Sequence, residues 1–218
     1  MEISSEAIEH LSSRDNRLAA VIAELGQIQC RDHDDPFPYL VHTVIEQMMS
    51  TKAAATINSR VLELCDGEVT PERIRRLGTE DLRATGMSMR KAQTVLSLAE
   101  RFGEYRFPEM ENAIDAEVFS RITAVPGLGP WSAKMYLIFV LQRDNVLPYE
   151  DGAFLQAYKW LYNARSLKPK TIERRCACWK PYQSIAARYL YRALDTGLTK
   201  EPVESLLERH VTSAVNGK

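Results

Sequence analysis

A segment rich in glycine and proline, "TAVPGLGPWSAK" at residues 123–134, constrains the fold more than any other part of the sequence. Pro126 and Pro130 lack a backbone N–H donor, and Gly127 and Gly129 are poor helix formers. A helix therefore cannot run through this segment, although helical patterns flank it on both sides. We expect a tight hairpin in which the glycines let the backbone turn sharply and leave amide groups exposed.

The rest of the sequence is typical of helices. Leu18, Val21, Ile22 and Leu25 are spaced as on the apolar face of an amphipathic helix. The run "YLVHTVIEQMMS" begins another helix, and "WSAKMYLIFVLQR", apolar on nearly all sides, predicts a buried central helix. Alternating patterns typical of β-strands are almost absent, so we expect an all-α fold.

Composition excludes a membrane-spanning chain and gives no overall charge bias. No apolar run approaches the roughly 20 residues needed to cross a bilayer, and the start "MEISSEAIEH" lacks a basic and apolar signal pattern. We expect a cytoplasmic protein, associated with the nucleoid if the source is bacterial. The net charge of -1 counts mildly against nucleic acid as a ligand, but phosphate binding depends on local charges and amides.

The cysteines and histidines do not predict a metal centre. Cys30, Cys65, Cys176 and Cys178 show no C-x-x-C spacing, so we expect free thiols and neither zinc nor an iron–sulfur cluster. His42 falls within a predicted helix and fits a packed or cleft residue better than a ligand.

The hairpin could bind a phosphate group. Amides in the glycine turn and at the start of the next helix would point outward, with the positive end of the helix dipole behind them. Such a site needs no lysine. An ordinary turn between two core helices is the alternative.

An acidic pair, Glu150 and Asp151, follows Pro148 in the loop "LPYEDG". Acidic residues in a loop are commonly solvated or act as the N-cap of the next helix. The order of a phosphate-binding hairpin, one buried helix and then a carboxylate also fits a catalytic role. The residues alone do not distinguish between the two carboxylates.

These motifs together resemble a known family. "VPGLGPWSAK" followed by "NVLPYEDGAFLQAY" is similar to the helix–hairpin–helix, Gly/Pro-rich loop and aspartate signature of the base-excision DNA glycosylase superfamily, HhH-GPD. Within it, the 3-methyladenine DNA glycosylase II (AlkA-like) enzymes look most similar. "DPFPYLVHTVIEQMMSTKAA", "TGMSMRKAQTVLSLA" and "CWKPYQSIAARYLYR" resemble further motifs in the family's order, from about Asp35 to Arg192.

The resemblance implies two helical subdomains with an active-site cleft between them. Residues 1–50 and 145–218 would form one subdomain. Residues 51–144 would form the other and carry the helix–hairpin–helix at about residues 115–142.

The resemblance also implies a reaction. Asp151 occupies the catalytic position, and Glu150 a neighbouring acidic position that is not the catalyst. The residue that is a Schiff-base lysine in glycosylase/lyase relatives is here Trp131, and Lys134 lies three residues later. Without an amine nucleophile, a monofunctional hydrolase that leaves an abasic site is expected.

The resemblance assigns further residues to the base, the DNA and an ion. Met48 falls where relatives insert a side chain into the gap left by the flipped base, although Glu46 departs from the family's usual glycine. No cofactor is required, but a structural Na⁺ or K⁺ ion at the hairpin is implied. The base pocket comprises Trp131, Tyr182, Tyr39, Gln47 and Met135; DNA contacts are Gly127, Gly129, Ser132, Lys134 and Met48; the ion's main-chain carbonyl ligands are Thr123, Val125 and Leu128.

The expected substrate is an alkylated purine in double-stranded DNA, bound by a monomer with no membrane partner. Positively charged alkylated purines are good leaving groups and stack well on electron-rich rings. Three alternatives stay open. The lesion could be a deaminated or oxidised base, the chain could be a DNA-binding hairpin module without catalysis, and Met48 or any single aromatic could be a core residue.

Overall fold

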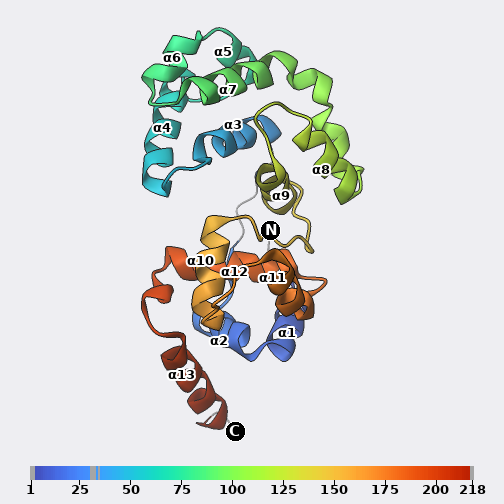
Figure 1. Ribbon diagram of the computed structural model, residues 1–218, viewed down its shortest axis with the longest axis vertical. Coiled ribbons are helices and arrows are strands. Elements are labelled where there is room, and N and C mark those ends of the chain that lie inside the picture. Colours follow the sequence, from blue (N-terminus) through green and yellow to red (C-terminus); the bar gives the residue numbers. More distant parts are fainter. Residues whose placement is uncertain (1–2, 30–32, 34, 217–218) are drawn as a thin grey trace. The chain divides into compact units, whose positions relative to one another are not determined.

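The computed structural model describes residues 3–29, 33 and 35–216. In this part of the chain the regular secondary structure consists of helices without a β-strand, which confirms the predicted all-α fold (Figure 1). No helix within these residues has both the length and the apolar character needed to cross a membrane.

The chain divides into two compact units. Residues 33–142 form the first, here called the hairpin unit, and residues 1–32 with 143–218 form the second, here called the aspartate unit. The predicted boundary placed residues 33–50 with the N- and C-terminal parts, and here the structure differs. Helix α3 (Pro36–Glu46) packs against α4 (Thr51–Leu64), α7 (Met89–Arg101) and α9 (Pro130–Phe139), so it belongs to the hairpin unit.

The hairpin unit consists of short helices whose ends follow local sequence signals. Thr70 caps α5 by accepting a hydrogen bond from the Arg73 amide at 3.2 Å, and Ser88 caps α7 in the same way. Helix α8 and helix α9 flank the glycine turn as predicted. The remaining helices of the unit are α5 (Pro71–Arg75), α6 (Thr79–Ala84), η1 (Phe102–Tyr105), η2 (Phe107–Asn112) and α8 (Asp115–Thr123).

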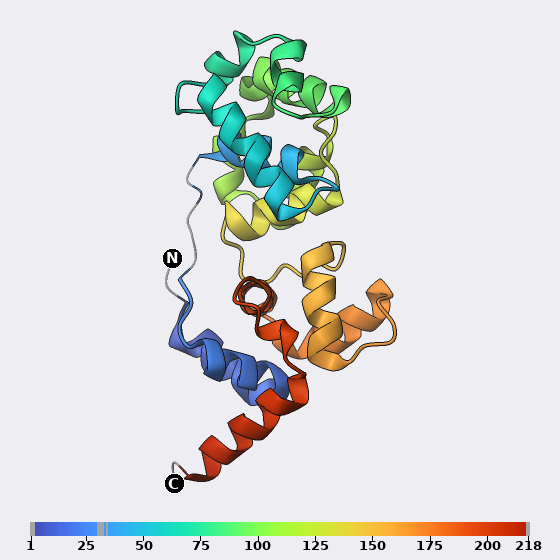
Figure 2. The same ribbon diagram turned by 90° about the vertical axis from the view of Figure 1, so that its left-hand side faces the viewer.

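The aspartate unit joins the two ends of the chain. Helix α2 packs on α12 and α13, and Figures 1 and 2 both show these segments side by side. The Trp179 indole nitrogen donates to Asp15 Oδ2 at 2.9 Å, and the Tyr162 hydroxyl donates to the same oxygen. The helices are α1 (Ser5–Arg14), α2 (Asn16–Leu25), α10 (Gly152–Tyr162), α11 (Pro169–Arg175), η3 (Cys176–Trp179), α12 (Gln183–Asp195), η4 (Leu198–Lys200) and α13 (Val203–Asn216).

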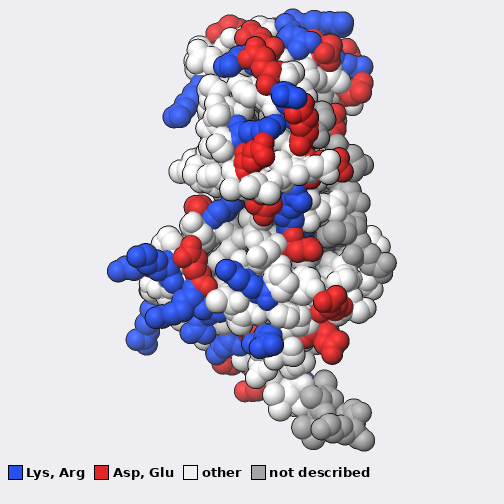
Figure 3. All heavy atoms as spheres, turned by 90° about the vertical axis from the view of Figure 1, so that its right-hand side faces the viewer, with Lys and Arg blue, Asp and Glu red and all other residues white. Residues whose placement is uncertain are grey.

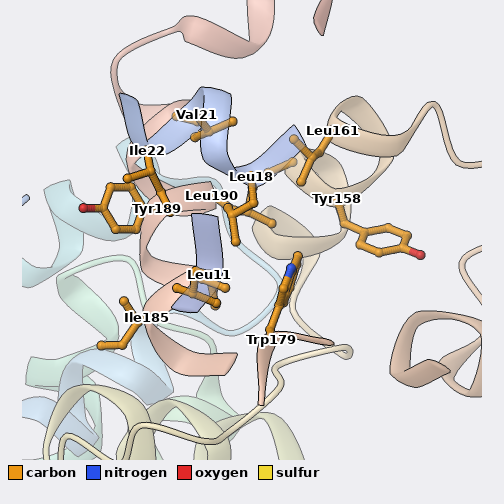
Figure 4. Close-up of a cluster of buried hydrophobic side chains, with 14 of the residues drawn as sticks. Leu11, Leu18, Val21, Ile22, Tyr158, Leu161, Trp179, Ile185, Tyr189 and Leu190 are labelled. Atoms are coloured by element: carbon orange, nitrogen blue, oxygen red, sulfur yellow. The ribbon is translucent and has the colours of Figure 1, made fainter. Parts of the chain in front are cut away.

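Apolar side chains from both ends of the sequence form the core of the aspartate unit. Leu11 and Leu18 point toward Leu190 and Trp179 in the close-up of Figure 4, and all four are fully buried. The transfer of such side chains from water contributes roughly 1.5–3 kcal/mol each. This core gives helix α10, which follows Asp151, a fixed support.

Candidate active site

The glycine turn lies directly against helix α7. Gly127 has a φ of +88°, and a Cβ atom at this position would come within 2.4 Å of Thr94 Oγ1. Glycine is therefore required here by both backbone conformation and space. Gly129 is the N-cap of α9 with an extended φ of −123°, and a Cβ there would meet open space. Because this N-cap residue has no side chain, it does not cover the backbone amides at the N-terminus of α9.

Gln47 connects the end of α3 to the hairpin. Its side-chain nitrogen donates to the Gly127 carbonyl at 2.9 Å and to Ser132 Oγ at 3.4 Å. Ser132 is buried, and its hydroxyl is thereby engaged within the protein. The structure thus places Gln47, which the resemblance assigns to the base pocket, against Gly127 and Ser132, which it assigns to DNA contact. The Gln47 side chain supports the turn.

Lys91 of α7 holds the end of α3 from the other side, and the sequence analysis gave it no role. Its ammonium group donates to the carbonyls of Ile45 and Gln47, both at 2.7 Å. Burial lowers the pKa of Lys91 from its usual value. The segment "GMSMRKA" contains this lysine, so the motif was visible, but the carbonyls it binds lie far away in the sequence.

Met48 projects into solvent. Its relative exposure is 103%, and its φ of +56° is uncommon for a residue with a side chain. Helix α3 ends at Glu46, so the predicted run through "EQMMS" instead becomes a turn before α4. The structure excludes a core role for Met48, and its use as a wedge in DNA stays a prediction.

The other predicted residues of the hairpin unit lie on α9 or pack against it. Tyr39 is buried, its hydroxyl donates to the Met135 carbonyl at 3.1 Å, and its ring lies 4.9 Å from that of His33. Met135 is buried as well, whereas Trp131 and Lys134 are half-buried on α9. Core packing, the open alternative for the aromatics, therefore describes Tyr39 better than Trp131.

The main-chain carbonyls that the resemblance assigns to a monovalent cation lie at and after the carboxyl end of α8. Helix α8 ends at Thr123, and the last carbonyls of a helix carry the negative end of its dipole. The Val125 carbonyl accepts from the Leu128 amide at 3.0 Å and retains a second lone pair. The carbonyls of Thr123, Val125 and Leu128 are hard, uncharged donors of the kind that Na⁺ or K⁺ takes.

Side-chain metal ligands do not cluster in the described residues. No group of three or more His, Cys, Asp or Glu side chains there could hold a metal ion. Cys65 and Cys176 are buried free thiols and Cys178 is an exposed one, whereas Cys30 lies outside the described residues.

Asp151 and Glu150 have different surroundings, although the sequence could not distinguish between them. Asp151 is the N-cap of α10: its Oδ1 accepts from the Phe154 amide at 2.7 Å, and the residue is only 9% exposed. Glu150 is exposed. The N-cap alternative is therefore correct for Asp151, and it fixes the carboxylate at the positive end of a helix dipole.

Tyr182 belongs to the aspartate unit, with Asp151. It is half-buried before α12, and its ring meets that of His10 edge-on at 5.4 Å. Burial and a hydrogen bond to Glu6 raise the pKa of Tyr182. The predicted pocket residues thus fall in two units, with Tyr182 in one and Trp131, Tyr39 and Met135 in the other.

Comparisons with known proteins extend over most of the chain. The family model of the HhH-GPD superfamily of base excision DNA repair proteins matches residues 41–181. DNA-3-methyladenine glycosylase 1 of Schizosaccharomyces pombe is 30% identical over 203 residues, which cover 89% of each chain.

Two solved structures are similar over nearly the whole chain. The crystal structure of DNA-3-methyladenine glycosidase from Bacillus halodurans has a TM-score of 0.78 and 32% identity, covering 95% of this chain and 98% of that one. The S. pombe 3-methyladenine DNA glycosylase Mag1 in complex with abasic DNA has a TM-score of 0.77 and 29% identity, covering 87% and 96%.

Proposed function

Because the chain belongs to the HhH-GPD superfamily of base excision DNA repair proteins, we propose that it is a monofunctional DNA glycosylase. Its substrate is an alkylated purine of the 3-methyladenine type in duplex DNA, and its product is an abasic site. The 3-methyladenine glycosylase names of the S. pombe and B. halodurans relatives support this substrate class. The Mag1 complex with abasic DNA supports DNA as the ligand.

The observation that carries the proposal is the setting of Asp151. The Phe154 amide holds its carboxylate, which is largely shielded from bulk water, whereas the adjacent Glu150 is exposed. Charges interact more strongly where water is excluded. Of the two carboxylates, Asp151 is therefore the one suited to stabilise a developing positive charge.

The reaction replaces one bond at the sugar with another. The bond between C1′ and the base nitrogen breaks, the base takes the bonding electrons, and a water oxygen bonds to C1′. The sugar carries oxocarbenium character in the transition state, and the Asp151 carboxylate stabilises it and orients the water. The proton lost by the water passes to the carboxylate or to solvent. A cationic alkylated purine leaves as a neutral base and needs little acid catalysis.

The hairpin binds the DNA backbone in this proposal. The amides of Gly127, Gly129 and the first turn of α9 form a phosphate site at a helix N-terminus, and Gly129 leaves that end open. The Ser132 side chain bonds to Gln47, so we assign its DNA contact to the main chain. A monovalent cation on the carbonyls of Thr123, Val125 and Leu128 would supply positive charge next to that phosphate.

The damaged nucleotide must leave the duplex before its sugar can react. We assign the wedge that fills the gap to Met48, because a flexible apolar side chain in full solvent contact has no role in the core. Trp131, half-buried on the first turn of α9, is the aromatic best suited to stack on the extruded base. Tyr39 and Met135, in the same unit as Trp131, are the further base contacts in the proposal.

We infer that the enzyme lacks lyase activity. Trp131 stands where a lyase has its lysine, and an indole cannot form a Schiff base. Lys134 is half-buried further along α9, and we assign it to DNA contact.

The proposed working form is a cytoplasmic monomer bound to double-stranded DNA, associated with the nucleoid in a bacterium. Neither zinc nor an iron–sulfur cluster takes part in the proposed steps, which use a carboxylate, water and backbone amides. No membrane surface is involved.

A panel of duplex oligonucleotides with methylated, deaminated or oxidised bases tests the function. We expect release of the methylated purine and strand cleavage only after alkali or heat. Release of only a deaminated or oxidised base would contradict the substrate class. An adduct trapped by borohydride would contradict the absence of lyase activity, and tight DNA binding without release of any base would indicate a non-catalytic module.

A further inference from the structure

Positive charge is concentrated in one segment of the aspartate unit. Residues 159–180 contain seven Lys or Arg and one acidic residue, Glu173, although the whole chain carries a net charge of -1. The rest of the chain therefore has a net charge of −7. Figure 3 shows a group of Lys and Arg side chains on one side of this unit, over α11 and the adjoining loop. The α11 basic patch comprises Lys159, Arg165, Lys168, Lys170, Arg174, Arg175 and Lys180.

The seven cations are exposed and are not neutralised by acidic partners. Within the residues that the structure describes, none of the seven forms an ion pair, whereas arginines such as Arg83, Arg101 and Arg106 are each paired with a nearby glutamate. Like charges that are not neutralised repel one another and oppose the compact state. A patch of this kind therefore indicates an anionic ligand.

The patch is spread along a surface and is bounded on one side. Lys159 and Arg165 line an open hollow of about 670 Å³ together with Trp160 and Asn163. Asn163 donates to Glu204 of α13 at 2.6 Å, so acidic side chains begin at that edge. The other cations lie on the loop before α11, on α11 itself and after η3. This distribution suits an extended polyanion better than a single small anion.

The patch begins at the far end of the helix that Asp151 caps. Helix α10 has 11 residues, so its carboxyl end is roughly 16 Å from Asp151. At 3.4 Å per base pair, 16 Å corresponds to about five base pairs of duplex.

We propose that the α11 basic patch is a second DNA contact, which binds the sugar–phosphate backbone about five base pairs from the damaged nucleotide. The identity of this ligand rests on the proposed function. The patch contributes affinity that does not depend on sequence or lesion, because phosphate contacts release counterions from any duplex. It retains the enzyme on undamaged DNA during the search for a lesion.

The test compares two triple variants with equal charge loss. Lys168→Gln, Lys170→Gln and Arg174→Gln together remove patch cations, and Arg76→Gln, Arg192→Gln and Lys200→Gln together remove exposed cations elsewhere. The dissociation constant for an undamaged duplex is measured across salt concentrations. At about 0.1 M salt we expect the patch variant to bind roughly 10- to 100-fold more weakly, with a slope of log K against log salt shallower by about 3.

The control variant should bind within about twofold of the wild type, and a patch variant with Lys168→Arg, Lys170→Arg and Arg174→Lys should also retain binding. The proposal would be overturned if the patch glutamine variant kept the wild-type affinity and salt slope. It would also be overturned if the patch and control glutamine variants lost the same affinity, because the loss would then follow net charge alone.

Binding to undamaged DNA requires no chemistry, so this test is separate from the test of the proposed function. With saturating enzyme, the patch variant should excise a methylated base at the wild-type single-turnover rate, while kcat/KM falls with affinity. A wild type that binds duplex through the patch but releases no base would refute the glycosylase and leave the patch. Normal base excision by the wild type, with no difference in duplex affinity between the patch and control variants, would refute the patch and leave the glycosylase.

Discussion

The glycine hairpin and the Asp151 loop are held by interactions of different range. The hairpin turn depends on Gln47, directly after α3, and on Thr94 of α7, which are both far away in the sequence. Asp151 is positioned by the Phe154 amide three residues ahead and by its own amide, which donates to the Pro148 carbonyl at 2.9 Å. The proposed phosphate-binding turn is therefore a product of tertiary structure, whereas the carboxylate proposed as catalytic is set by local structure. The predictions below test this difference, from the largest expected effect to the smallest.

Gly127→Ala should destabilise the protein by about 3 kcal/mol, because the new Cβ would collide with Thr94 and the residue would keep a positive φ. In a Thr94→Ala background the loss should fall to about 1–2 kcal/mol. Gly129→Ala is the matched control and should cost less than about 1 kcal/mol, since its Cβ meets open space. Urea unfolding measures all of these. Equal losses at the two glycines would show that contact with α7 does not hold the turn.

Lys91→Met should cost about 2 kcal/mol in unfolding free energy, because the carbonyls of Ile45 and Gln47 lose a charged donor. It should also weaken DNA binding by releasing the loop that carries Met48. Lys52→Met, at an exposed position, is the control and should stay within about 0.5 kcal/mol of the wild type. A Lys91→Met protein with normal stability and normal DNA affinity would remove Lys91 from the account of the hairpin.

Gln47→Ala should cost about 1 kcal/mol and should lower excision more than stability, since its amide orients Gly127 and Ser132. Gln93→Ala changes an exposed glutamine on α7 and should have no measurable effect. Single-turnover base release and urea unfolding, taken together, distinguish positioning from stability. The same small loss of activity in both variants would contradict a link between α3 and the turn.

Glu46→Gln should have the smallest effect and should depend on pH. Glu46 lies 3.1 Å from His42, and its hydrogen bond raises the pKa of His42 although burial opposes the shift. The stabilisation is fully present below the unfolded histidine pKa of about 6.5 and is lost as pH rises through the folded pKa. For a half-exposed pair, we expect less than about 1 kcal/mol lost at pH 5.5 and none at pH 8.5. Unfolding of Glu46→Gln and of the exposed control Glu100→Gln at both pH values checks this. A loss unaffected by pH would contradict it.

The range of these interactions also explains what the sequence could predict. The hairpin, its flanking helices and the possibility that Asp151 caps α10 follow from proline, glycine and capping signals within a few residues. Whether residues 33–50 join the hairpin unit depends on the packing of α3 on α7 and α9, which no local pattern encodes. The same holds for Lys91, whose carbonyl acceptors are more than 40 residues away.

Met48 is a mixed case. Its apolar side chain continues the helical pattern of "YLVHTVIEQMMS", so the sequence left a core position and a DNA wedge as alternatives. The helix ends at Glu46, between the Ile45 and Gln47 carbonyls that Lys91 binds, and the chain then turns with Met48 at positive φ. The hydrogen bonds from Lys91, on the distant helix α7, therefore accompany the exposure of Met48, which the local pattern alone would have buried.

The most direct test of the central claim compares Asp151→Asn with Glu150→Gln. Asparagine caps a helix about as well as aspartate, so Asp151→Asn should keep the fold and the affinity for abasic DNA while removing the charge. The account predicts that single-turnover release of a methylated purine falls by a factor of about 10³ in Asp151→Asn and stays near the wild-type rate in Glu150→Gln. Full activity of Asp151→Asn, or the same loss in both variants, would contradict a catalytic carboxylate at Asp151.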